Sequence, residues 1–374
     1  MLISLRARPA SAVVALLAAA FLLVGCGSVP PTGWAGARVV DQVIYFGSET
    51  GRVFAINAAD GAVKWQFPAD KPLSPTSLYS TPFVADNVVY FGAYDRNFYA
   101  LDAATGTSKW PQPFAVGEPV VSSPAVSGGV VYFGANDKKV YALDAATGAK
   151  KWEPFLTGGE VWADLTLADG VLYAASLDHK LYALDAAIGT KKWDFDAGGM
   201  IAAKPAVANG VVYVAGLSNV YALDAATGKP KWDQPFQASS WVWSNPTLAN
   251  GILYFGTLNT GDVYALDAAT GKPKWNAPFK AGGPVRSAVV VDNGMAYFGS
   301  DDFKVYAIDA ATGAGKWTYP TGNRIIASPA VANGVVFVPS FDRVFYALDG
   351  ADGKVKWMLD TNSGKLVTPT PPPK

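Results

Sequence analysis

The sequence has very few of the residues that build most metal and catalytic sites. Its 374 residues include one cysteine, Cys26, and one histidine, His179. A single cysteine cannot form an internal disulfide and is too little for a structural zinc site. One histidine leaves little for general acid–base catalysis, although carboxylates could still serve. No Gly-x-Ser-x-Gly, His-Glu-x-x-His or phosphate-loop motif is present, and we expect His179, in a predicted turn, to be exposed and not catalytic.

Charge is also scarce, and it is balanced. Only 16% of the residues are charged, and 30 basic residues offset 30 acidic ones. A nucleic-acid-binding protein would need a basic face, so the composition predicts no nucleic-acid partner. Half of the residues are hydrophobic, and 38 glycines and 26 prolines suit many short strands joined by tight turns.

Residues 1–25 have the sequence features of a lipoprotein signal peptide. Arg6 and Arg8 precede an apolar run, Ala12 to Val24, that is too short for a comfortable membrane span. The segment Leu23-Val24-Gly25-Cys26 resembles a bacterial lipobox. That resemblance implies cleavage before Cys26 and lipid on its thiol; the alternative is an ordinary signal peptide with a chance cysteine.

A lipidated Cys26 would carry several acyl chains, which anchor a protein stably where one chain is marginal. Residues 26–33 then form a short flexible tether. We therefore expect a secreted, lipid-anchored protein whose partner at this end is the membrane. Gly27 resembles the pattern of lipoproteins sent to an outer membrane. The expected location is the periplasm-facing outer membrane of a two-membrane cell, or otherwise the outer face of the cell membrane.

The rest of the chain repeats one pattern that ends in tryptophan. The tryptophans are separated by 45, 42, 41, 39, 43, 42 and 40 residues. A fixed period near forty residues indicates a repeat architecture. The closing tryptophans are Trp65, Trp110, Trp152, Trp193, Trp232, Trp275, Trp317 and Trp357. Each is expected to be structural and to dock neighbouring units on each other by burying its indole.

Each unit reads as four short strands separated by turns. In the third unit the expected strands are Ser123–Ser127, Val130–Gly134, Lys139–Leu143 and one that begins at Lys150. These segments are rich in β-branched and aromatic residues and are bounded by Gly, Asn and Asp.

Two aspartates recur in the turns of the repeat. The turn before each tryptophan begins with aspartate, or with Asn57 in the first unit, and ends with glycine; its aspartates are Asp102, Asp144, Asp185, Asp224, Asp267, Asp309 and Asp349. A second set stands in the turn between the two central strands, at Asp95, Asp137, Asp178, Asp302 and Asp342. Aspartate stabilises such turns by accepting backbone hydrogen bonds. Because the spacing of calcium loops is missing, we predict no metal site.

The segment Ala142-x-Asp144-x-x-x-Gly148-x-x-x-Trp152 resembles the tryptophan-docking motif of the PQQ-like β-propeller family. The resemblance covers nearly everything from Trp34 to Trp357. It implies an all-β fold: an eight-bladed β-propeller of four-stranded antiparallel blades. We assign residues 34–360 to the propeller and residues 361–374 to a Pro-rich C-terminal tail. Because Pro369 has the phase of a first strand, the tail is expected near the first blade, or else as a frayed end.

The copies differ most between each tryptophan and the next unit. The residue before each first-strand proline, or its equivalent, reads Thr81, Ser123, Asp164, Lys204, Asn245, Ser287, Ser328 and Thr368. These loops should gather on one face, around a central funnel. The candidate binding face comprises Glu160, Trp162, Asp164, Lys204, Trp241, Trp243, Asn245, Arg286 and Arg324. Mixed aromatic and charged residues are typical of recognition surfaces. The alternative is that Trp162 and Trp243 fill the funnel and that Asp164 and Lys204 form a solvated ion pair.

Two functions of different classes follow from the resemblance. PQQ-dependent dehydrogenases hold the quinone and a calcium ion in the funnel, beside a pair of neighbouring cysteines that this chain lacks. Lipid-anchored propellers of the BamB type assemble outer-membrane proteins by binding a protein partner. We therefore predict a non-enzymatic, protein-binding scaffold with no catalytic residues and no cofactor, monomeric or part of a hetero-complex with an envelope protein. The alternatives are a PQQ- and calcium-dependent dehydrogenase and a polysaccharide-binding surface propeller.

Overall fold

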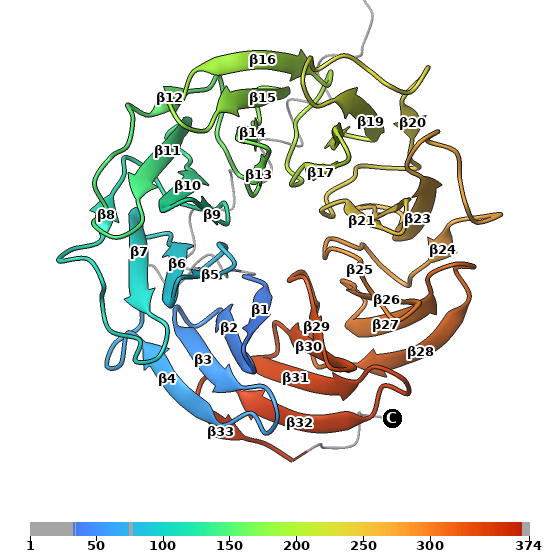
Figure 1. Cartoon of the computed structure of the whole chain (residues 1–374). Helices are drawn as coiled ribbons and strands as arrows, with labels where there is room; N and C mark the ends of the chain where they lie inside the picture. Colours follow the sequence, from blue (N-terminus) through green and yellow to red (C-terminus); the bar gives the residue numbers. More distant parts are fainter. Residues whose placement is uncertain (1–32, 34, 75–77, 369–374) are drawn as a thin grey trace, which may run out of the picture. The chain divides into compact units, whose positions relative to one another are not determined.

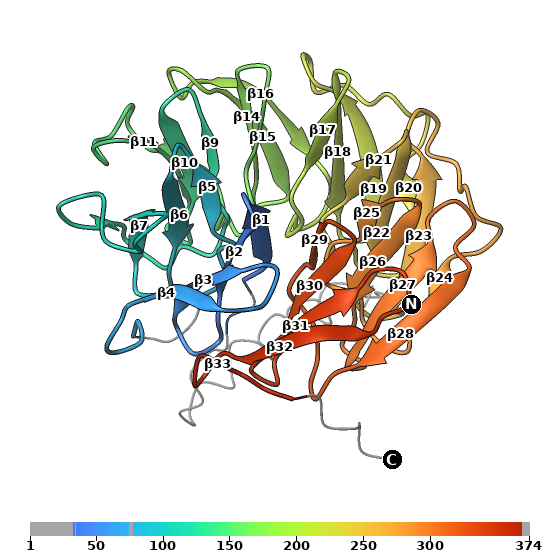
Figure 2. The same cartoon turned by 60° about the horizontal axis from the view of Figure 1, so that its bottom comes forward.

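The computed structural model describes residues 33, 35–74 and 78–368, and within these it contains only strands, turns and loops. The strands form eight separate sheets arranged in a ring, each a blade of a β-propeller (Figure 1). The expected all-β, eight-bladed fold is therefore confirmed. Within each blade neighbouring strands are antiparallel; the first strand faces the central opening and the fourth lies at the outside (Figures 1 and 2).

The strands follow the sequence without crossing from one blade to another. Blades 1 and 2 comprise β1 (Ala37–Val40), β2 (Val43–Gly47), β3 (Val53–Asn57), β4 (Val63–Phe67), β5 (Phe83–Ala85), β6 (Val88–Gly92), β7 (Asn97–Asp102) and β8 (Phe114–Ala115). Blades 3 and 4 comprise β9 (Ala125–Ser127), β10 (Val130–Gly134), β11 (Lys139–Asp144), β12 (Phe155–Leu156), β13 (Thr166–Ala168), β14 (Val171–Ala175), β15 (Lys180–Asp185) and β16 (Lys191–Asp196).

The second half of the chain repeats this order. Blades 5 and 6 comprise β17 (Ala206–Ala208), β18 (Val211–Gly216), β19 (Asn219–Asp224), β20 (Phe236–Gln237), β21 (Thr247–Ala249), β22 (Ile252–Gly256), β23 (Asp262–Asp267) and β24 (Phe279–Lys280). Blades 7 and 8 comprise β25 (Val290–Asp292), β26 (Met295–Gly299), β27 (Lys304–Asp309), β28 (Gly315–Pro320), β29 (Ala330–Ala332), β30 (Val335–Pro339), β31 (Val344–Asp349), β32 (Val355–Asp360) and β33 (Lys365–Leu366).

The outer strand takes two forms, and proline explains the difference. In blades 1, 4, 7 and 8 it is continuous through the tryptophan, as in β16. In blades 2, 3, 5 and 6 a proline stands just before the phenylalanine that follows the tryptophan, as Pro154 does before Phe155. Proline has no N–H to donate to the sheet. The expected strand from Lys150 is therefore reduced to an isolated bridge between Leu143 and Lys150, followed by the two-residue strand β12.

Each recurring tryptophan docks its blade on the next one, as the sequence predicts. The indole Nε1 of Trp110 donates a 3.1 Å hydrogen bond to the carbonyl oxygen of Ala145 in blade 3. The hydroxyl of Tyr90 donates to the same oxygen over 3.0 Å. The indole also packs against Gly148, where a Cβ would lie 2.9 Å from the ring. All eight tryptophans make the equivalent hydrogen bond to the following blade.

The ring closes by the same docking and without strand exchange. Blade 1 is built from β1 to β4 alone. Trp357 of blade 8 donates to the carbonyl oxygen of Ala58 over 3.1 Å, and Phe345 packs against Phe46 with ring centroids 4.2 Å apart. Arg343 and Glu49 add an ion pair of 2.9 Å across this junction. The first and last blades therefore meet through the same tryptophan docking that joins the other neighbours.

The segment after Asp360 extends the last blade. β33 pairs with β32 as a fifth, outermost strand, and Leu366 lies beside Gly61 of blade 1. β33 therefore lies near the first blade, although Thr368 is exposed and does not begin an inner strand. The predicted signal peptide, Cys26 and the last six residues lie outside the described part of the chain. No helix among the described residues is long and apolar enough to cross a membrane.

Candidate functional site

The loops that enter the blades gather at one end of the propeller. In an antiparallel four-stranded blade, the entering loop and the turn between the two central strands lie at the same end. Along the entering loops of blades 2, 4, 5, 6 and 7 the residues alternate between buried and half-buried positions, as in Val161 to Leu165. Such alternation is that of an extended chain, whose successive side chains point to opposite sides. The buried side chains fill the junctions between blades, and the others reach the channel and its mouth.

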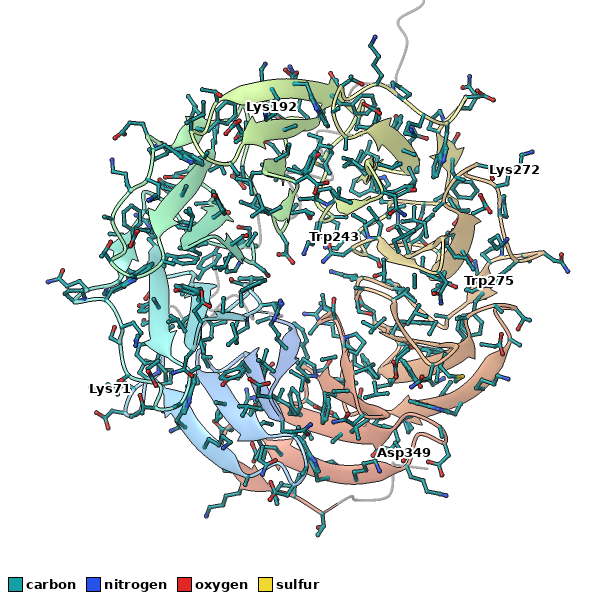
Figure 3. The ribbon with its side chains drawn as sticks, viewed as in Figure 1. Lys71, Lys192, Trp243, Lys272, Trp275 and Asp349 are labelled. Carbon is teal, nitrogen blue, oxygen red and sulfur yellow. The ribbon has the colours of Figure 1, made fainter. Side chains whose placement is uncertain are left out.

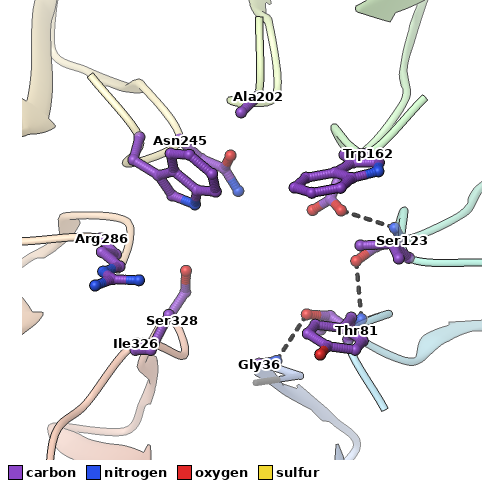
Figure 4. Close-up of a pocket in the computed structure, with 13 residues that line it drawn as sticks. Gly36, Thr81, Ser123, Trp162, Ala202, Asn245, Arg286, Ile326 and Ser328 are labelled. Atoms are coloured by element: carbon purple, nitrogen blue, oxygen red, sulfur yellow. Dashed lines mark hydrogen bonds between the residues drawn. The ribbon is translucent and has the colours of Figure 1, made fainter. Parts of the chain in front are cut away.

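The innermost of these positions forms a ring of hydrogen bonds around the channel. At five of the eight junctions, the backbone N–H of the ring residue donates to the side chain of the ring residue in the next blade. Gly36 donates to Thr81 Oγ1 over 2.8 Å, Thr81 to Ser123 Oγ over 2.8 Å, and Ser123 to Asp164 Oδ1 over 2.7 Å (Figure 4). On the other side, Lys204 donates to Asn245 Oδ1 over 2.8 Å and Ala288 to Ser328 Oγ over 2.9 Å.

The side-chain chemistry explains where this ring is interrupted. Each link needs a side-chain acceptor on the ring residue of the next blade, and the lysine side chain has donors only. The N–H of Asp164 therefore finds no acceptor on Lys204. The ring is likewise interrupted before Ala288 and before Gly36, because these residues have no side-chain acceptor. The structure also corrects two of the expected positions, because Ala288 and Gly36 stand in the ring in place of Ser287 and Thr368.

Ser287 lies one residue earlier in its loop and is fully buried. Its hydroxyl donates to the carbonyl oxygen of Gly299 and accepts from the N–H of the same residue, at 3.0 and 2.8 Å. Ser122 makes the same pair of hydrogen bonds with Gly134. The position is therefore structural, and the sequence misplaced it because the loop of blade 7 has no proline to mark the register.

Above the ring, the side chains two residues earlier in the entering loops of blades 2 to 8 line the mouth of a pocket. Trp162 and Trp243 come from blades 4 and 6, with Ala202 of blade 5 between them. Arg286 of blade 7 and Tyr79 of blade 2 complete the larger side chains of the lining. Figure 3 shows Trp243 at the central opening, whereas the docking residue Trp275 lies toward the outside. Both channel tryptophans remain partly exposed, so they line the funnel without sealing it.

The pocket encloses about 630 Å³, including the part open to solvent. Its floor is the hydrogen-bonded ring, which includes Asp164 of blade 4 and Asn245 of blade 6. The sequence missed Tyr79 as a lining residue. The repeat spacing held the signal, because Tyr79 precedes Thr81 by the same two residues that separate Trp162 from Asp164.

Arg286 is held by an acidic partner that the sequence did not suggest. Its guanidinium lies 2.8 Å from Asp301, in the turn between the central strands of blade 7, and the two side chains are only 20% and 13% exposed. Burial raises the pKa of Asp301, and the neighbouring Arg286 and Arg324 oppose that rise. The alternative ion pair between Asp164 and Lys204 does not form. Among the described side chains Lys204 has no carboxylate within 4.0 Å, and Asp164 accepts the ring hydrogen bond instead.

A third position, four residues before the ring residue of each loop, places Glu160, Trp241 and Arg324 on the rim of the pocket. Their carbonyl oxygens accept the N–H groups of Leu177, Leu258 and Phe341, which stand in the turns of blades 4, 6 and 8. Glu160 accepts the indole N–H of Trp162 over 2.6 Å. The guanidinium of Arg324 lies 4.8 Å from the ring centre of Phe341 and is exposed. The nine predicted residues therefore occupy three successive layers at one end of the propeller, on blades 4 to 8.

The recurring turn aspartates have structural roles. Asp144 accepts hydrogen bonds from the backbone and hydroxyl of Thr147, which with the nearby Lys151 lower its pKa. Asp178, of the other set, accepts from the hydroxyl of Tyr182 and from the N–H of Gly158 in the entering loop, both over 2.6 Å. Burial raises the pKa of Asp178, but these hydrogen bonds outweigh it and the pKa falls below its ordinary value. The second set thus helps to fix the loops that carry the candidate face.

The donor set of the funnel does not fit a calcium ion and its quinone. Calcium takes six to eight oxygen ligands, several of them carboxylates. Among the described residues Asp164 is the single carboxylate that lines the pocket, and one of its oxygens accepts the Ser123 N–H. Across the residues that the structure describes, no group of three or more His, Cys, Asp and Glu side chains is placed to hold a metal ion. His179 is exposed in the turn of blade 4, away from the pocket lining.

Several solved structures share this fold. The computationally designed protein Ika8 matches with a TM-score of 0.71 at 15% identity, over 87% of this chain and 95% of its own. BamB from Moraxella catarrhalis matches with a TM-score of 0.68 at 18% identity, over 84% and 96%. A europium-containing methanol dehydrogenase matches with a TM-score of 0.65 at 17% identity, over 84% and 82%. Catalytic and non-catalytic propellers thus share this architecture, and fold alone does not decide function.

A comparison with curated protein sequences gives no match. A protein-family model described as the outer membrane protein assembly factor BamB matches nearly the whole chain beyond residue 26. The matched segments overlap and comprise residues 27–161, 116–203, 197–278 and 259–372. The chain therefore belongs to the family of the outer membrane protein assembly factor BamB.

Proposed function

We propose that this protein is a non-catalytic scaffold that is anchored to a membrane through Cys26 and binds an envelope protein. The family to which it belongs supports a role in the assembly of outer-membrane proteins. In a cell with two membranes the propeller would face the periplasm from the outer membrane, and otherwise it would stand on the outer face of the cell membrane. The lipid would hold the binding face close to partners in the same membrane.

One observation carries the proposal: the departures from the repeat meet on one end of blades 4 to 8. Trp162, Trp241 and Trp243 lie there with Arg286 and Arg324. Tryptophan and arginine are the residue types that most often dominate the binding energy of protein interfaces. The opposite end carries near-identical turns in which Asp, Thr and Gly stabilise the backbone. A uniform end and a varied end are expected when one of the two recognises a partner.

The test is capture of partners from solubilised membranes by the full chain. The variant combines Trp241→Ala, Trp243→Ala and Arg324→Ala. Arg286 is left in place because its removal would strand the buried carboxylate of Asp301, which destabilises a fold in its own right. We expect the triple variant to keep its melting temperature and to lose its partner.

Ile188→Thr is the matched control. Ile188 is 62% exposed in a turn at the opposite end of blade 4, where blades 2, 3, 5, 6 and 7 have threonine. This variant should capture the partner normally. Normal capture by a folded triple variant would contradict the proposal. The dehydrogenase alternative predicts an absorbance or fluorescence change when PQQ and calcium are added, and we expect none.

A further inference from the structure

The funnel pocket combines aromatic walls with one carboxylate that no cation neutralises. Its aromatic side chains, Tyr79, Trp162 and Trp243, come from three different blades but from the same position of the entering loop. Trp162 is held by its 2.6 Å hydrogen bond to Glu160. The ring of Tyr79 packs on Tyr94 with centroids 5.6 Å apart. Trp162 and Tyr79 are therefore positioned before any ligand arrives.

The charges of the lining leave a net negative centre. Arg286 is paired with Asp301 over 2.8 Å. Asp164 has no lysine, arginine or histidine within 4.0 Å among the described residues. Asp164 lines the pocket; its Oδ1 accepts the N–H of Ser123, and its Oδ2 accepts no hydrogen bond from the described residues. The pocket thus offers one carboxylate oxygen without a hydrogen-bond partner among the described residues, in a lining that also holds the indole of Trp162.

We propose that this pocket receives one arginine side chain from a loop of the partner protein. A planar guanidinium can stack on an indole and at the same time donate hydrogen bonds to a carboxylate. A negatively charged group would meet Asp164, and the one cation in the lining is already held by Asp301. The inference rests on the proposed scaffold function, because it assumes that the occupant belongs to a protein.

The test uses the full chain with its tryptophan indole N–H groups observed by ¹H–¹⁵N NMR. The probe is the peptide acetyl-Gly-Arg-Gly-amide, and acetyl-Gly-Glu-Gly-amide and the disaccharide cellobiose are compared with it. We expect the arginine peptide to shift the signals of Trp162 and Trp243, each assigned by its phenylalanine variant. The glutamate peptide and the disaccharide should leave both signals in place.

Asp164→Asn separates recognition from structure. Asn245 already accepts the same ring hydrogen bond through an amide oxygen, so the variant should keep the link to Ser123 and its melting temperature. Loss of the charge should weaken binding of the arginine peptide by about tenfold, as expected for a hydrogen bond to a charged group. Asn245→Asp adds a second carboxylate across the pocket and should strengthen binding.

The inference is overturned if Asp164→Asn binds the arginine peptide as well as the unaltered chain does. It is also overturned if the glutamate peptide or cellobiose shifts the two indole signals and the arginine peptide does not. Capture of the membrane partner is measured in parallel. A folded Asp164→Asn chain that captures its partner at full strength would leave the scaffold function intact and remove the arginine site alone.

Discussion

The indole Nε1 of Trp357 donates a 3.1 Å hydrogen bond to the carbonyl oxygen of Ala58, which is 299 residues away in the chain. This contact closes the ring, and it differs from its seven counterparts in one respect. At every other junction a tyrosine hydroxyl shares the accepting carbonyl oxygen with the tryptophan. At the closing junction the corresponding residue is Phe337, so Trp357 is the single side-chain donor to Ala58 among the described residues.

Trp357→Phe should therefore cost more stability than the same change at another junction. Without the indole N–H, the Ala58 carbonyl oxygen is left buried without a partner, which costs about 1–3 kcal/mol. In Trp275→Phe the hydroxyl of Tyr254 still donates to Ala310 over 3.0 Å, so the loss should be about 1 kcal/mol. Urea unfolding followed by tryptophan fluorescence compares the two. Equal losses would show that the closing junction is not special.

Phe337→Tyr should stabilise the ring by supplying the missing hydroxyl. The phenylalanine ring lies 5.9 Å from Trp357, close to the 6.0 Å between Tyr297 and Trp317 at the preceding junction. A new hydrogen bond to Ala58 should add about 1 kcal/mol. The matched change Tyr297→Phe should lower the melting temperature. A destabilised Phe337→Tyr variant would mean that the closing junction has no room for the hydroxyl.

Gly148→Ala should be more damaging than Gly170→Ala. Both glycines have a positive φ, +75° and +73°, so alanine is strained at each by about 1 kcal/mol. At Gly148 the added Cβ would also lie 2.9 Å from Cδ2 of Trp110, whereas at Gly170 nothing lies within 4 Å. Overpacking of this kind costs a further 1–3 kcal/mol, approximately. The difference between the two melting temperatures isolates the contact with the tryptophan.

The propeller should lose stability in alkali because of its buried tyrosines. Burial, and then repulsion from Asp86 and Asp144, raises the pKa of Tyr90 from 10.0 to about 12. The pKa of Tyr90 is higher in the folded chain than in the unfolded chain, so folding favours the protonated phenol. The contribution of Tyr90 to the free energy of unfolding is therefore complete below pH 10.0 and is lost as the pH rises toward about 12. Urea midpoints measured through this window should fall steadily. Tyr90→Phe should flatten the decline, and a constant midpoint would contradict the expectation.

Cys26→Ser should release the protein from membranes. The expected lipid is attached to this thiol, and without it the remaining chain has no acyl anchor. After cell fractionation the unaltered protein should sediment with membranes and the variant should remain in the aqueous fraction. Mass spectrometry of the N-terminal peptide supplies an independent check, because it detects the acyl chains directly. A variant that still fractionates with membranes would exclude anchoring through Cys26.

The sequence by itself determined the architecture. Regularly spaced tryptophans, each preceded by an aspartate-to-glycine turn, specify one four-stranded unit, and every such unit must bury its indole on the next. Local chemistry also identified the turn roles of residues such as Asp144 and Asp178. These features are readable because they depend on interactions within one repeat or between neighbouring copies of it.

The tertiary structure decided what the entering loops do. It showed that the ring position belongs to Ala288 and Gly36, that Asp164 accepts the Ser123 N–H instead of pairing with Lys204, and that Arg286 is held by Asp301. These relations join residues of different blades or of a loop and a turn, and no repeat period specifies their geometry. The pocket exists only because the propeller closes: eight loops meet at one axis, and that convergence brings Tyr79, Trp162 and Trp243 together around a carboxylate.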